Sequence, residues 1–265
     1  MKRKILPIPI LGCLLCAFVV MAQDSFYAYY RDGSIEKFST NNVDSISLVR
    51  PHGTVTDVCG NTYNFLLIGD LLWFTENMRC NKYNNGTEMM STCGEEPYCY
   101  AFGQCGVNTP KTKVSDDYIL KAGYYYAYNI ARFDVICPDG WRVPTVDDFK
   151  NLFNYAKNED NVKGLRSKEG WLNYSGKDAP GTDDLGFCAL PIGFGYRSTP
   201  YSSIGGSSAF FWTSTKYNPD SDYVADIYYA EITGQDHTNA KNANAQLTWM
   251  APIRCCRDKM PVDGN

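Results

Sequence analysis

Short runs of alternating apolar and polar residues dominate the first part of the chain. FYAYY and SIEKF flank the turn signal RDG at 31–33, and a third such run follows at 43–48. Alternation between turn residues is typical of β-strands joined by tight turns. Pro and Gly then come together at 51–53 and indicate a boundary. We therefore predict a small β segment over residues 23–51.

A second set of alternating runs begins directly after this boundary. TVTDV is followed by a turn signal at 59–61, and Tyr63, Phe65 and Leu67 alternate along the next strand. Gly69 and Asp70 then form another turn signal before LLWFT. This pattern predicts a β-meander that opens a larger domain, which we place at residues 54–258 with a tail at 259–265.

One segment has helical periodicity instead. Its apolar residues fall on one face of a helix and are Val146, Phe149, Leu152, Phe153 and Ala156. Thr145 is placed to cap this helix, and Asp148 completes a capping-box-like pair three residues later. Asp147 and Asp148 are adjacent carboxylates, but successive helical side chains point about 100° apart. We interpret them as capping residues and not as an acid–base pair.

The remaining segments are rich in loops. Residues 80–121 are polar, contain four cysteines and predict a long surface insertion tied down by disulfides. From Gly164 onward the chain is rich in Gly and Ser, with short strand-like runs such as AFFWTST and YVADIYYAEI. One helix among many short strands and long loops predicts an α+β fold.

The first 22 residues have the pattern of a cleavable export signal. Lys2, Arg3 and Lys4 precede a mostly apolar run, and small residues lead to a cleavage site near Ala22. The sequence ILGC at 10–13 faintly resembles a lipid-attachment site, but cleavage there would leave an apolar tail at 14–21, so we favour export without a lipid anchor. No later segment is long and apolar enough to span a bilayer.

Charge and histidine content exclude several classes of function. The chain has 25 Lys and Arg against 29 Asp and Glu, and loss of the signal's three cations lowers the net charge from −4 to −7. Such a surface argues against a nucleic-acid partner. The only histidines are His52, in a Pro-His-Gly junction, and His237, in a polar stretch. Neither is placed where a fold would orient it, which argues against histidine-based triads and multi-histidine metal sites. We expect no cofactor.

Nine cysteines remain in the exported chain, and in that compartment most should form disulfides. Because nine is odd, at least one thiol stays free or pairs between chains. Zinc is disfavoured because the exported chain, residues 23–265, contains no Cys-x-x-Cys. The pattern leaves the pairing of five cysteines open: Cys59, Cys80, Cys93, Cys99 and Cys105.

Several ordered motifs resemble one known family. They are TVTDVCGNTYNFLLIGDLLWFTENM, GYYYAYN, CPDGWRVPT, GLRSKEGW, GTDDLGFCALPIGF, AFFWTST and APIRCCRD. Together they resemble the Fibrobacter succinogenes major paralogous domain family. The resemblance implies an exported, usually surface-associated domain with a C-type-lectin-like fold: one or two helices on a twisted antiparallel sheet, with long loops that bind. The family has no established enzyme activity to carry over.

The resemblance also implies roles for individual residues. Cys137 and Cys255 would form the disulfide that closes the domain. Trp141, Trp171 and Trp212 match family tryptophans, which we interpret as core anchors, and Arg254 would be an internal salt-bridging or hydrogen-bonding residue. Two cysteines depart from the family pattern, Cys188 and Cys256. Because both stand where apolar residues are usual, we predict that they pair with each other.

The first functional hypothesis is a non-enzymatic surface-binding or adhesion module whose partner is a glycan or a surface protein. If the loops carry the site, four tyrosines are its first candidates: Tyr98, Tyr100, Tyr201 and Tyr217. Asn218, Asp220 and Asp222 alternate like part of a calcium loop, but the sharp-turn glycine and the distal glutamate of an EF-hand are missing. A solvated turn is the favoured interpretation, so we assign no metal.

Two other hypotheses remain. The chain could be a relative of formylglycine-generating oxidases, which bind copper through two cysteines near the C-terminus. Here Cys255 and Cys256 are adjacent, and consecutive strand side chains point to opposite faces, which disfavours a shared metal. Alternatively, it could be a structural subunit of a surface assembly such as a pilus tip or scaffold, with the N-terminal β segment docking on this domain or on a partner strand.

Overall fold

The chain divides into two compact units, residues 1–49 and 50–265. The computed structural model describes residues 50–89, 120–196, 205–216, 227–243 and 249–258, together with the strands at 25–29, 35–39 and 100–101. No helix in these ranges combines the length and apolar character that crossing a bilayer requires.

The first unit contains a two-stranded antiparallel ribbon. Strands β1 (Ser25–Tyr29) and β2 (Ile35–Ser39) pair in a register that places Phe26 opposite Phe38 and Tyr29 opposite Ile35. Both strands coincide with runs that the alternating pattern predicted.

The second unit begins with the meander expected from the sequence. Strands β3 (His52–Thr56), β4 (Thr62–Ile68) and β5 (Leu71–Phe74) pair in succession, and β13 (Cys256–Asp258) joins the far edge of β5. The turns fall where they were predicted, with φ of +83° at Gly60 and +62° at Gly69. β3 starts at His52, however, inside the stretch interpreted as a boundary.

Two further sheets complete the domain. One has the order β6-β7-β12-β8, formed by Tyr100–Ala101, Tyr125–Ala127, Trp249–Ala251 and Gly195–Tyr196. The other has the order β11-β10-β9, formed by Thr238–Ala243, Ile227–Thr233 and Ser208–Lys216. All strand pairs described in these sheets are antiparallel, so the domain is of the α+β class.

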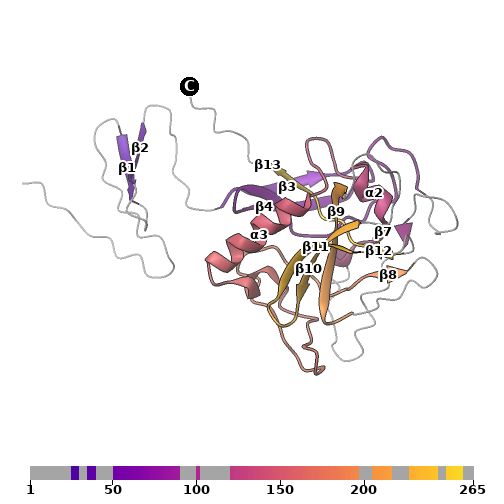
Figure 1. Cartoon of the computed structure of the whole chain (residues 1–265). Coiled ribbons are helices and arrows are strands. Elements are labelled where there is room, and N and C mark those ends of the chain that lie inside the picture. The colour runs from indigo at the N-terminus through magenta and orange to yellow at the C-terminus, as the bar shows by residue number, and fades with distance from the viewer. Residues whose placement is uncertain are drawn as a thin grey trace, which may run out of the picture. The chain divides into compact units, whose positions relative to one another are not determined.

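The main helix, α3 (Val146–Asn158), packs against both the sheet that contains β5 and the sheet that contains β9 (Figure 1). Phe149 in its first turn packs against Trp73 of β5 and Phe211 of β9, with ring centroids 5.2 and 5.6 Å apart. The five apolar residues predicted for its inner face are all buried. Two short helices accompany it, α2 (Tyr128–Arg132) and the 3-10 helix η2 (Val162–Leu165).

The core is built around aromatic side chains, as its composition suggests. The three family tryptophans are buried, with exposed fractions of 7% for Trp141 and 1% for Trp171 and Trp212. The indole Nε1 of Trp212 donates to the carbonyl of Tyr126 at 2.7 Å, and that of Trp171 donates to Ser167 Oγ at 3.0 Å. Their predicted role as core anchors is confirmed.

Arg254 is also fully buried and is held by hydrogen bonds. Its Nε and Nη2 donate to Asn77 Oδ1 at 3.1 and 2.8 Å, its Nη1 donates to the carbonyl of Phe187, and its guanidinium lies 4.4 Å from the Phe187 ring centroid. Burial lowers the pKa of Arg254 to about 10, so the guanidinium remains charged at neutral pH. Arg254 therefore links the C-terminal segment, from inside the core, to the loop that follows β5.

Candidate functional site

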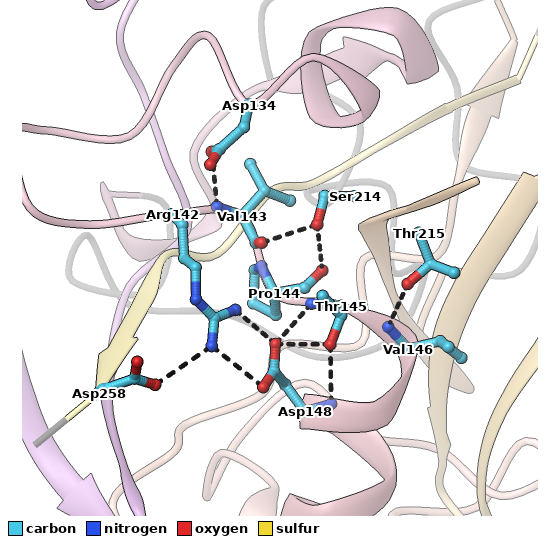
Figure 2. A network of polar contacts seen from close by, with 10 residues as sticks. All are labelled: Asp134, Arg142, Val143, Pro144, Thr145, Val146, Asp148, Ser214, Thr215 and Asp258. Atoms are coloured by element: carbon cyan, nitrogen blue, oxygen red, sulfur yellow. Dashed lines mark hydrogen bonds and ion pairs between the residues drawn. The ribbon is translucent and has the colours of Figure 1, made fainter. Parts of the chain in front are cut away.

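A polar network fixes the start of α3 (Figure 2). Asp148 N donates to Thr145 Oγ1 at 3.1 Å and Thr145 N donates to Asp148 Oδ2 at 2.7 Å, so the predicted capping box is confirmed. Arg142 adds a forked contact, with Nη1 2.5 Å from Asp148 Oδ2 and Nη2 3.1 Å from Asp148 Oδ1. Asp258 of β13 lies 3.4 Å from the same Nη2.

The network extends to β9, so it anchors the helix to the sheet. Ser214 Oγ donates to the carbonyl of Val143 at 3.0 Å, and Val146 N donates to Thr215 Oγ1 at 2.9 Å. Burial alone would raise the pKa of Asp148, but hydrogen bonds from Arg142 and Thr145 outweigh this effect and lower it. Asp148 is therefore a charged structural carboxylate at neutral pH.

Next to this network lies an open groove of about 530 Å³. It runs between α3, the β4–β5 turn and the end of β13. Its floor is apolar and consists of Ile68, Trp73 and Leu152, which are all buried. The polar lining comprises Asp70, Asp148, Asn151, Asn154, Asn158 and Asp258.

Three asparagines follow the groove along α3. Asn151, Asn154 and Asn158 are exposed and lie within about 60° of one another around the helix axis. In the described part of the chain their side chains form no hydrogen bond with protein groups. Asn has a lower helix propensity than Ala, Glu or Lys, so these residues do not serve helix stability. Their amides are available to an external ligand.

Tyr155 supplies an aromatic surface beside the asparagines. It is half-buried, and its ring lies against Gly69, where an added Cβ would come within 3.5 Å of Tyr155 Cγ. Gly69 has a positive φ, so the turn that brings the main chain against the ring requires a residue without a side chain. The groove thus combines an aromatic face, planar amides and carboxylates.

Most residues predicted as ligand contacts lie outside the described residues. This holds for Tyr98, Tyr201 and Tyr217, and also for the weak calcium candidates Asn218, Asp220 and Asp222. Tyr100 lies in β6, where it pairs with Tyr126 across the strands, but only its backbone is described. These assignments remain predictions.

Sequence reasoning missed the groove residues. It used the apolar side of α3 to predict a helix and left the polar side unexamined. The signal was present, because asparagines recur at i, i+3 and i+7 on one face. The β4–β5 turn and Asp258 that complete the groove are distant in the sequence.

Two disulfides lie within the described ranges. Cys137 and Cys255 are bonded across a sequence separation of 118, the pair that the resemblance implies. Cys59 and Cys80 form the second, which ties the β3–β4 turn to the start of the cysteine-rich segment. Disulfides fit a protein that works outside the cell.

The predicted pairing of Cys188 with Cys256 is wrong. Both are buried free thiols, and they belong to different apolar clusters. Cys188 packs with Leu190 and Ile192, whereas Cys256 packs under α3 with Phe149. Two unusual cysteines in one sequence therefore gave no information about their separation in space.

The geometry of Cys255 and Cys256 also argues against a shared copper ion. Cys255 is bonded to Cys137, and Cys256 lies in a different core cluster, as expected for consecutive residues of an extended segment. Of these two residues, only Cys256 carries a free thiol.

One group of potential metal ligands occurs among the described residues: Asp57, Cys59 and Cys80. The two sulfurs are joined in a disulfide, whereas a metal would need them as thiolates. Asp57 Oδ1 accepts from Cys59 N and Asn61 N, each at 2.9 Å, and Oδ2 accepts from Tyr63 Oη at 2.7 Å. With the disulfide formed, the group organises a turn.

The fold and groove define a disulfide-linked α+β domain with an open polar groove beside its main helix. Residues 66–257 match the model of the Fibrobacter succinogenes major domain, which is more than half of the chain, and the chain therefore belongs to this family. This confirms the family predicted from the motifs. The comparisons with curated proteins and with solved structures give no match.

Proposed function

We propose that this protein is an exported, non-enzymatic surface-binding module with a C-type-lectin-like fold, and that its ligand is a glycan bound in the groove beside α3. Export rests on the signal pattern of residues 1–22 and on the disulfides. The proposal that the protein is not an enzyme rests on the family resemblance and on the scarcity of histidine.

The observation that carries the glycan assignment is the composition of the groove. Planar amides and carboxylates pair with the hydroxyl groups of sugars, and a tyrosine ring packs against the apolar face of a pyranose. Asn151, Asn154 and Tyr155 provide these two kinds of contact on one helix face. The groove is open, which suits a ligand carried on a larger polymer or surface.

The test is a glycan and mucin array with the oxidised mature protein, with and without EDTA. We expect specific binding that falls about tenfold in Tyr155→Ala, a loss equivalent to one aromatic contact. Tyr155→Phe should keep the ring and most of the binding. Tyr174→Ala is the matched control, because Tyr174 is a 64% exposed tyrosine outside the groove.

Each other outcome has a distinct meaning. Binding that survives Tyr155→Ala but is lost in Tyr201→Ala or Tyr217→Ala would place the site in the loops. EDTA sensitivity would point to a calcium site such as the one considered at 218–222. A blank array would contradict glycan binding and favour a structural subunit of a surface assembly.

A further inference from the structure

The Cys59–Cys80 disulfide differs from the other described disulfide in its access to solvent. Cys137 and Cys255 are 2% and 0% exposed, so that bond is closed to attack while the domain is folded. Cys80 is fully buried as well, but Cys59 is only partly buried. A disulfide is reduced when a thiolate reaches one of its two sulfurs. An external thiol therefore has a point of attack at Cys59 in the folded protein.

The two segments that carry these sulfurs are held by hydrogen bonds that do not depend on the disulfide. Asp57 Oδ1 accepts from Cys59 N, and Asp57 N donates to the carbonyl of Asn61 at 2.9 Å. On the other side, the buried hydroxyl of Tyr126 donates to the carbonyl of Cys80 at 2.9 Å. These bonds remain when the S–S bond opens, so reduction leaves two thiols side by side.

A third potential ligand lies beside the two sulfurs. The ligand atoms of Asp57, Cys59 and Cys80 all lie within 4.8 Å of one another. Asp57 Oδ2 accepts from Asn61 Nδ2 at 3.1 Å, and the same Nδ2 lies 3.4 Å from the carbonyl oxygen of Arg79. Because this amide has a second acceptor, Asp57 can turn one lone pair to a metal without leaving Asn61 unsatisfied.

We propose that reduction of the Cys59–Cys80 disulfide turns this group into a binding site for a thiophilic divalent cation such as Zn²⁺. An external dithiol gives two electrons and two protons to the disulfide and is itself oxidised to a disulfide. The metal then binds both sulfurs as the two thiols release their protons to solvent, and Asp57 supplies a third ligand. This site is independent of the proposed glycan binding.

The spacing of the two cysteines suits such an ion. Two sulfurs on one tetrahedral zinc, each at ~2.3 Å, lie about 3.8 Å apart. The Cα atoms of Cys59 and Cys80 are 5.6 Å apart, so rotation of the two side chains reaches that separation without a shift of the main chain. Water completes the tetrahedron on the side where Cys59 meets solvent. The redox state of one bond thus decides whether a disulfide or a metal closes the turn.

The test compares the oxidised and reduced mature protein, with Co²⁺ as the spectroscopic probe. A dithiol reduces the folded protein and is removed by desalting under argon, and peptide mapping by mass spectrometry identifies the cysteines that have become free. The same titration is run on the variant Cys93→Ser, Cys99→Ser, Cys105→Ser, in which these cysteines supply no ligand. We expect the reduced forms of both proteins to bind a single Co²⁺ per chain, with thiolate-to-cobalt charge-transfer absorption and tetrahedral d–d bands that Zn²⁺ abolishes. The oxidised forms should show neither.

Single substitutions identify the ligands. Cys59→Ser and Cys80→Ser should each weaken binding by more than about 100-fold, the upper range for changes that only touch a ligand's neighbours. Asp57→Asn should weaken it at least about tenfold and keep the charge-transfer band, since both sulfurs remain. Asp139→Asn, which changes an exposed aspartate outside this group, is the matched control and should bind like the wild type.

Three results would overturn the proposal. Cobalt binding that persists unchanged in Cys59→Ser would place the metal on other thiols. Cleavage of Cys137–Cys255 before Cys59–Cys80 would contradict the access at Cys59. Loss of the near-UV circular dichroism on reduction, before any metal is added, would show that the turn does not hold without its S–S bond.

Discussion

At the scale of single residues, Asp148 shows how one carboxylate can serve the fold at several points. It caps α3, pairs with Arg142 and lines the groove. Asp148→Asn should destabilise the domain by about 1–3 kcal/mol at pH 7, since the ionic hydrogen bonds from Arg142 and the negative charge at the helix N-terminus are both lost. Denaturant unfolding measures this, with Asp147→Asn, an exposed carboxylate in the same turn, as control.

The pH dependence of that loss follows from the lowered pKa of Asp148. A carboxylate with a lowered folded-state pKa contributes stability that is fully present above its unfolded pKa, about 3.9, and is lost as pH falls through the folded value. The stability difference between wild type and Asp148→Asn should therefore shrink below about pH 4. A difference that stayed constant from pH 7 to pH 2 would contradict the charged role.

The two free thiols should be chemically silent in the folded protein. Burial, with the nearby carboxylate of Asp183, raises the pKa of Cys188 to about 11, and burial also raises the pKa of Cys256. We expect neither to react with iodoacetamide at pH 8 until denaturant is added, because the thiolate is the nucleophile. Peptide mapping by mass spectrometry gives the answer, and rapid labelling of either thiol in the native state would refute it.

At the scale of elements, α3 was predictable and the groove was not. The helix follows from local spacing, and its capping box spans only four residues. The partners of Asp148 that complete the network include Arg142, whose contact with Asp258 joins residues 116 apart. Helix α2 escaped prediction because it is five residues long with four of them buried, which leaves no polar face to mark its period.

The asparagines of α3 lead to a prediction about both the stability of the domain and its glycan binding. Asn154→Ala should leave the domain as stable or raise its stability by several tenths of a kcal/mol, because Ala has the higher helix propensity. The same change should weaken glycan binding, so stability and binding move in opposite directions. Thermal unfolding and titration on one protein preparation test both. Lys150→Ala, at another exposed position of α3, should affect neither strongly.

At the scale of the whole molecule, the two described disulfides should differ in what they contribute. Cys137–Cys255 closes a loop of sequence separation 118, and Cys59–Cys80 one of 21. If a cross-link acts mainly by restricting the unfolded chain, these loops correspond to roughly 5 and 3.5 kcal/mol. The longer link joins the segment before α3 to the residue that precedes β13.

Removing each pair separately measures that difference. Cys137→Ala, Cys255→Ala should lower the free energy of unfolding by about 1.5 kcal/mol more than Cys59→Ala, Cys80→Ala does. Both sites are largely buried, so cavity effects partly cancel in the comparison. Equal losses would indicate that the unfolded chain is already compact around Cys137. A larger loss for the short loop would show that the Asp57 turn, and not chain entropy, determines the stability of this domain.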